Sequence, residues 1–154
     1  MRNEEVELKH IQLELNNERS QHLRHFVDQY FCYKNGYVNK NGKPKWDLIF
    51  WKEWVSEEAE KVSHKDLVVK EHIVPLKVIT DKLKELDSNC TIEQIKSIID
   101  EFLHFATITK EEDKRLSSLG FKQKMPNEFY EENHNMFGDI FARYKVAEIK
   151  CIKA

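Results

Sequence analysis

The stretch DLVVKEHIVPLKVI, residues 66–79, places an acidic residue and a histidine directly after a short apolar run. The apolar run is typical of a short strand, and Pro75 marks a turn after it. A second run of this kind, FATIT, occupies residues 105–109, and the apolar residues between the two runs recur with helical spacing. These patterns predict a mostly helical α+β fold, in which helices surround a small β element with short strands near 66–71 and 105–108.

Length and composition favour a single domain over residues 1–154, with an N-terminal helical segment at about 3–31. Hydrophobic residues make up 40% of the chain and charged residues 34%, which is typical of a helix-rich folded protein. No apolar run approaches the roughly 18 residues of a membrane span, and the N-terminus lacks the apolar core of a secretory signal. We therefore expect a cytoplasmic protein that does not bind a membrane.

The net charge of −2 argues against a protein that coats nucleic acid through overall positive charge, but it leaves room for a local basic patch. The most basic segment is YKNGYVNKNGKPKW, residues 33–46, where two Asn-Gly pairs and a proline predict a loop or small hairpin. We interpret its lysines as a solvated surface, with phosphate contact as the alternative. The three cysteines are far apart and suggest neither a zinc ribbon nor a disulfide framework.

A long helix is expected in KWDLIFWKEWVSEEAEKV, residues 45–62. Trp46, Phe50 and Trp54 recur at intervals of four, which would place three large rings on one face of that helix. Rings at this spacing are more often part of a core than of a binding site. We therefore expect this helix to pack its aromatic face inward.

Other helices are expected at about 76–86, at 91–104 and from about Phe137 onward, where apolar residues again recur with helical spacing. Two helix starts have the sequence pattern of a capping box, in which a threonine and a side chain three residues later satisfy each other's backbone N–H groups. These pairs are Thr91 with Gln94 and Thr109 with Glu112.

The pair Glu71-His72 is the strongest candidate for chemistry. A histidine can act as general base on a water molecule while a neighbouring carboxylate holds a divalent cation that stabilises charge on a phosphate. The motif EHIVPL, residues 71–76, resembles the first motif of the HNH (His-Me finger) nucleases. Downstream, FATITKEEDKRL, residues 105–116, resembles the strand-then-helix piece of that superfamily. The resemblance covers about residues 66–116 and implies a diverged HNH-like core at about 64–120.

This resemblance implies a metal-dependent endonuclease, a hydrolase that cleaves phosphodiester bonds of DNA or RNA. His72 would be the general base, and Glu71 would hold the metal with Asp113 or Glu112. Such oxygen ligands favour Mg²⁺ or Mn²⁺. Three cationic side chains on the following helix would contact phosphates: Lys110, Lys114 and Arg115. The small size of the chain suggests a phage- or defence-related protein.

The alternative is a non-enzymatic helical interaction protein that binds or inhibits a protein or nucleoprotein partner. In that case Glu71 and His72 only satisfy backbone groups or meet solvent at the end of a strand. The two interpretations predict different geometry. The nuclease requires the side chains of Glu71, His72 and Asp113 to converge on one point, whereas the interaction protein requires an exposed apolar patch.

Overall fold

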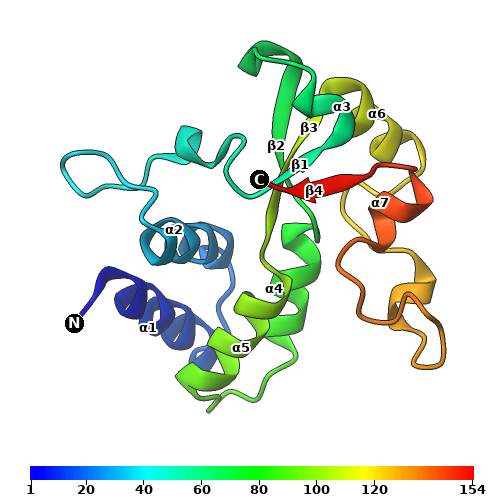
Figure 1. Cartoon of the computed structure of the whole chain (residues 1–154). Helices are drawn as coiled ribbons and strands as arrows, with labels where there is room; N and C mark the ends of the chain where they lie inside the picture. The colour runs from blue at the N-terminus through cyan, green and yellow to red at the C-terminus, as the bar shows by residue number, and fades with distance from the viewer. The chain divides into compact units, whose positions relative to one another are not determined.

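Figure 1 shows the computed structural model of the protein, which describes residues 1–154. It contains seven α-helices and one four-stranded sheet, so the predicted mostly helical α+β fold is confirmed. The chain divides into two compact units. Unit 1 comprises residues 1–48 and 79–103, and unit 2 comprises residues 49–78 and 104–154. None of the helices combines the length and the apolar character needed to cross a membrane.

Unit 1 is helical. Helices α1 (Asn3–Asn16) and α2 (Leu23–Asn35) lie side by side, and α5 (Ile92–Phe102) packs against α1 (Figure 1). The apolar residues that recur with helical spacing in α1 are buried, which fixes the face that this helix turns to its neighbours. The polar run after α1 breaks the helix at Glu18, whose φ is 55°. The N-terminal segment therefore forms two helices.

Unit 2 contains the sheet, in the strand order β2-β3-β1-β4. Strands β2 (Val68–His72) and β3 (Phe105–Thr109) pair in antiparallel fashion, which confirms the two strands predicted from the sequence. Strand β1 (Trp54–Ser56) runs parallel to β3, and β4 (Cys151–Lys153) pairs with β1 in antiparallel fashion. Sequence patterns missed β1 and β4, which have only three residues each.

Apolar side chains cover both faces of the sheet. On one face, Ala106 and Ile108 pack with Leu116 of α6 (Lys110–Ser118) and with Tyr144 of α7 (Ala142–Val146). On the other face lies a smaller cluster of buried residues from β1, α3 (Glu57–Glu60) and β2. Because α6 begins directly after β3 and contacts both β2 and β3, these three elements form a strand–strand–helix unit.

The prediction of one long helix over residues 45–62 is wrong. The segment forms a 3-10 turn (Trp46–Ile49), strand β1 and the short helix α3. The chain reverses at Trp51, whose φ is 59° and whose backbone N–H donates to Thr107 Oγ1 at 2.8 Å. As a result Phe50 packs on the α3 face of the sheet and Trp54 on the opposite face, so the aromatic residues do not share one helical face.

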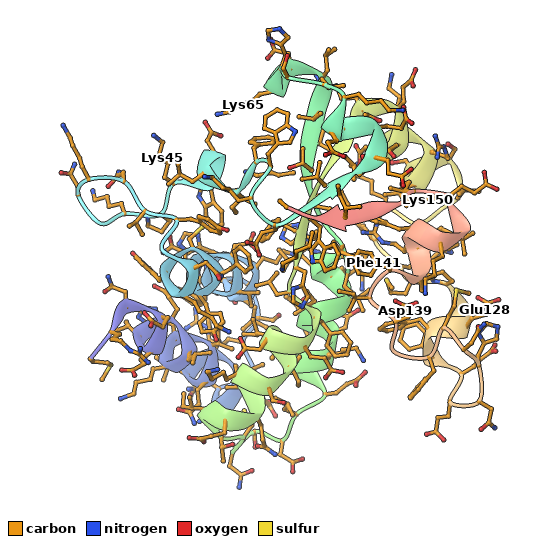
Figure 2. The ribbon with its side chains drawn as sticks, viewed as in Figure 1. Lys45, Lys65, Glu128, Asp139, Phe141 and Lys150 are labelled. Atoms are coloured by element: carbon orange, nitrogen blue, oxygen red, sulfur yellow. The ribbon has the colours of Figure 1, made fainter.

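The helix expected from Phe137 begins later, because α7 spans only Ala142–Val146. Gly138 has a φ of 67°, a left-handed conformation that ends any helical run, and Asp139 Oδ1 accepts a hydrogen bond from the Phe141 backbone N–H at 2.9 Å. Phe141 still packs on the sheet, against the ring of Trp54 with centroids 4.9 Å apart (Figure 2). Phe137 lies before this helix and is exposed.

The other predicted helices are present with slightly shorter bounds. Helix α4 spans Leu76–Lys84 and α5 spans Ile92–Phe102. Both capping boxes are confirmed, since each threonine side chain and its partner side chain bond to one another's backbone N–H groups. Two further 3-10 turns complete the chain, at Lys65–Leu67 and Asn127–Tyr130.

Candidate functional site

Strand β2 places Glu71 and His72 on opposite faces of the sheet, because neighbouring side chains of a strand alternate. Glu71 pairs with Ala106 of β3, on the face that α6 and α7 cover. His72 pairs with Phe105, and the two rings lie with centroids 4.4 Å apart. The acid and the histidine thus meet different surroundings, although they are adjacent in the chain.

The carboxylate of Glu71 is bound by two neighbouring residues of α7. Nη2 of Arg143 lies 2.9 and 3.0 Å from the two carboxylate oxygens, and the Tyr144 hydroxyl donates to Oε1 at 2.5 Å. We call Glu71, Arg143 and Tyr144 the Glu71 cluster. Both oxygens of the acid are therefore already engaged by protein donors.

Arg143 is fully buried, and the other N–H donors of its guanidinium group bond to backbone carbonyls. Its Nη1 donates to the Phe121 carbonyl at 2.6 Å, and its Nη2 and Nε donate to carbonyls at the end of β2, those of His72 and Ile73. The side chain therefore ties α7 to β2 and to the segment after α6. A planar group with five N–H donors suits such a junction, which a lysine could not satisfy in the same way.

The electrostatics of the Glu71 cluster follow from its burial. Burial raises the pKa of the Glu71 carboxyl, while the charge of Arg143 and the hydrogen bonds from Tyr144 and Arg143 oppose that rise. Burial also raises the pKa of the Tyr144 hydroxyl well above its ordinary value, and the nearby Glu71 carboxylate adds to this effect. Tyr144 is therefore a neutral hydrogen-bond donor, and Arg143 supplies the positive charge of the cluster.

The other acidic candidates lie on α6. Glu112 is buried, and its Oε1 accepts hydrogen bonds from the Thr109 backbone N–H at 2.9 Å and from the Ser56 hydroxyl at 2.6 Å. Asp113 is only partly buried. Glu112 thus caps its own helix and fastens it to β1, which is a structural role.

The cationic candidates on α6 differ among themselves. Lys110 and Lys114 are exposed. Arg115 is also exposed but donates from Nη1 to the Ala147 carbonyl at 2.8 Å, so part of its guanidinium is used to hold α7. Two of the three predicted phosphate contacts are therefore available at the surface.

The residues expected to hold Mg²⁺ or Mn²⁺ do not fit a metal ion in this arrangement. Both oxygens of Glu71 are bound to a guanidinium and a hydroxyl, Glu112 is used as a cap, and His72 lies on the other face of the sheet. No group of three or more His, Cys, Asp or Glu side chains is placed so that it could bind a cation together. The donor that faces Glu71 is Arg143, which sequence reasoning missed.

Only a weak signal could have identified Arg143 from the sequence. In FARYKV, residues 141–146, the arginine lies between Ala142 and Tyr144, and all three are buried. An arginine inside an apolar run suggests a buried cation that needs an acidic partner. Nothing in the sequence indicates that the partner is Glu71, which lies 72 positions away.

A solvent-open hollow of about 600 Å³ lies beside the Glu71 cluster and is lined in part by Tyr144. Apart from Ile149, its remaining lining residues are all charged: Glu57, Glu58, Glu112, Lys145, Glu148 and Lys150. Four of its charged lining residues are acidic and two are basic, Lys145 and Lys150, of which Lys150 is labelled in Figure 2. Acidic side chains therefore outnumber basic ones in the lining of this hollow.

Comparisons with protein-family models, with curated proteins and with solved structures found no match. The resemblance of EHIVPL and FATITKEEDKRL to the HNH nucleases therefore stays a prediction from the sequence.

Proposed function

We propose that the protein binds nucleic acid without cleaving it, through a strand–strand–helix unit that resembles the HNH core but has exchanged its metal site for a buried ion pair. The observation that carries this proposal is the position of Arg143, whose Nη2 lies 2.9 and 3.0 Å from the Glu71 carboxylate oxygens. A guanidinium here provides the positive charge that a divalent cation would provide in an HNH-type site.

The strength of this ion pair supports the loss of metal chemistry. Removing one partner of a buried ion pair typically costs about 3–5 kcal/mol, because the other charge is left without compensation. A metal ion at Glu71 would have to displace Arg143 and then leave that fully buried guanidinium with only carbonyl partners. Mg²⁺ also gives up its hydration water reluctantly, so it competes poorly for a carboxylate that is already bound.

The same unit supports contact with nucleic acid. Strands β2 and β3 pair in antiparallel fashion and α6 packs across both, which is the strand-then-helix order implied by the two motifs. Lys110 and Lys114 on α6 are exposed cations. Lysines of this kind contribute to nucleic-acid affinity by neutralising phosphates and releasing counterions.

Hydrolysis is the second candidate, and one observation favours it. His72 is the last residue of β2, at the end of the strand where the HNH motif places its general base, and Asp113 lies on the helix that packs against that strand. For hydrolysis to occur, Glu71 would have to exchange Arg143 for a metal ion. Hydrolysis would also require the His72 side chain, which lies on the other face of the sheet, to approach the same metal site.

A cleavage assay combined with a binding assay separates the candidates. Plasmid DNA and a structured RNA are incubated with Mg²⁺ or Mn²⁺ and either the wild-type protein or His72→Ala, while binding to labelled oligonucleotides is followed by fluorescence anisotropy in EDTA. We expect equal, background cleavage by both proteins together with saturable binding. Cleavage by the wild type that His72→Ala abolishes would establish the nuclease instead, and absence of binding to every oligonucleotide would refute the proposal.

A further inference from the structure

We propose that the lysine-rich hairpin between α2 and the 3-10 turn at Trp46, residues 36–45, is a second surface that contacts the nucleic-acid backbone, in addition to the lysines of α6. This inference rests on the proposed binding function and extends the contact surface to a second named element. The hairpin projects as an extended loop after α2 in Figure 1, and Figure 2 labels Lys45 at its base. It belongs to unit 1, so it is a different surface from the Glu71 cluster of unit 2.

Charge is concentrated in this hairpin and in the residues that flank it. Residues 33–46 contain four lysines and no acidic residue, which leaves 21 basic against 27 acidic side chains in the rest of the chain. Lys34 is compensated, because its Nζ lies 2.6 Å from Asp100 Oδ1. Lys40, Lys43 and Lys45 are exposed and pair with no carboxylate. A protein of net charge −2 thus carries one segment of purely positive charge.

The hairpin is held in one conformation by its own hydrogen bonds. The Asn39 side-chain oxygen accepts from the backbone N–H groups of Asn41 and Lys43 at 2.8 and 3.1 Å. Backbone bonds join Asn39 to Lys43 at 2.8 Å and Lys45 to Tyr37 at 2.9 Å. Gly42, with a φ of 79°, supplies the left-handed residue that the tip requires. Because the backbone is ordered before binding, less entropy is lost on contact with a ligand.

The register of the hairpin directs two of these lysines to one side. Lys43 and Lys45 are two positions apart on one arm, so their side chains leave the same face of the ribbon. Their partners across the ladder are Asn39 and Tyr37, and the Tyr37 ring packs against Phe31 of α2, with centroids 5.9 Å apart. The face that carries Lys43 and Lys45 is therefore anchored to a helix, and Lys40 adds a third charge at the tip.

A nucleic-acid backbone fits this surface better than an anionic membrane does. A membrane-binding element combines basic residues with exposed large apolar side chains that enter the lipid. None of the large exposed hydrophobic residues of this protein lies within residues 33–46. A narrow hairpin with cationic side chains, whose two arms are joined at the bridge between Val38 and Pro44, is in contrast close in shape to the two-stranded ribbon that the DNA major groove admits.

The test compares three proteins in EDTA, where cleavage cannot interfere. The hairpin variant is Lys40→Gln/Lys43→Gln/Lys45→Gln. The matched control is Lys9→Gln/Lys84→Gln/Lys122→Gln, which removes the same charge from exposed positions elsewhere. Affinity for labelled duplex DNA and single-stranded RNA is measured by anisotropy over a series of salt concentrations. Vesicles containing an anionic phospholipid provide a separate arm.

We expect the hairpin variant to bind at least about tenfold more weakly than the wild type at moderate salt. For duplex DNA, the slope of log affinity against log salt concentration should be smaller in magnitude by about 2–3, because three phosphate contacts are lost. The control should match the wild type. Equal binding by all three proteins, or equal losses in both variants, would overturn the hairpin assignment and leave the binding function standing. Two results would overturn both the hairpin assignment and the proposed binding function. One is binding to vesicles but not to oligonucleotides that depends on the hairpin lysines, and the other is a wild-type protein that binds no oligonucleotide.

Discussion

The Glu71 cluster of unit 2 and a second cluster around Asp100 in unit 1 each join one carboxylate to a tyrosine and to basic side chains, one arginine at Glu71 and two lysines at Asp100. Asp100 accepts hydrogen bonds from the Tyr30 hydroxyl at 2.7 Å and from Nζ of Lys34 and Lys96, each at 2.6 Å. The clusters differ in burial. The lysines at Asp100 are 40% and 50% exposed, whereas Arg143 at Glu71 is 0% exposed.

The difference in burial reverses the effect on the acid. Burial raises the pKa of Glu71 despite its cation. At Asp100 burial acts in the same direction, but the hydrogen bonds from Lys34, Lys96 and Tyr30 outweigh it and hold the pKa of that carboxyl below its ordinary value. Similar clusters of a carboxylate, a cation and a tyrosine therefore form a partly exposed ion pair in one unit and a buried ion pair in the other.

The largest expected effect comes from removing the buried cation. Arg143→Met should destabilise the protein by about 3–5 kcal/mol at pH 7, because Glu71 keeps a charge without compensation. Urea denaturation of the wild type, Arg143→Met, Glu71→Gln and the double variant gives the coupling energy between the two residues. A double variant that loses the full sum of the two single losses would show that the pair is not coupled.

The destabilisation caused by Arg143→Met should also depend on pH. The charge of Arg143 is the largest influence that opposes burial at Glu71, so in Arg143→Met we expect the folded-state pKa of that carboxyl to lie still further above its unfolded value. Ionisation of Glu71 then disfavours the fold, so the destabilisation should grow as the pH rises above about 4.3, the ordinary pKa of Glu, and shrink below it. Urea denaturation of the wild type and Arg143→Met at pH 5 and pH 7 measures this dependence. A loss of unfolding free energy that is larger at pH 5 than at pH 7 would contradict it.

A smaller effect is expected at the partly exposed cluster. Asp100→Asn should cost about 1 kcal/mol at pH 7, because it removes charge-assisted hydrogen bonds that solvent partly screens. The folded pKa of Asp100 is depressed, so its contribution is present above the unfolded pKa and is lost as the pH falls through the folded pKa. The difference between the wild type and Asp100→Asn should therefore vanish under acidic conditions, and a difference that persists there would exclude ionisation as its cause.

The smallest effect is expected for Lys34→Met, the surface counterpart of Arg143→Met. One exposed lysine at an ion pair contributes at most about 1 kcal/mol, and Lys96 still bonds to Asp100. Added salt should reduce the difference from the wild type further. A loss as large as that of Arg143→Met would mean that burial does not distinguish the two clusters.

Local sequence patterns predicted the elements whose signals are local. The strands around 66–71 and 105–108 and the capping boxes at Thr91 and Thr109 follow from a few consecutive residues, and all are confirmed. The aromatic spacing at residues 45–62 gave a wrong prediction of one helix. Rings four residues apart also occur in a turn followed by a strand, where the side chains pack on both faces of a sheet. Periodicity cannot distinguish these cases without the neighbouring strands.

The sequence predicted two residues of the candidate site but not their partners, because those partners are brought in by long-range packing. Glu71 and His72 are recognisable in the sequence, and the alternation of a strand already implies that they face different ways. The partner of Glu71 is fixed by the packing of α7 on the sheet, which brings Arg143 across 72 positions of sequence. A long-range ion pair of this kind leaves no local pattern that distinguishes it from a metal ligand.

The central claim is that Arg143, rather than a metal ion, neutralises Glu71. Titration of ¹⁵N-labelled protein with Mn²⁺ tests it directly, because a paramagnetic ion broadens the amide signals of residues close to it. We predict that amides 70–73 of wild type and of Glu71→Gln lose intensity equally and no more than the rest of the chain. Selective loss at these amides in the wild type, abolished by Glu71→Gln, would contradict the account and restore the metal-dependent nuclease.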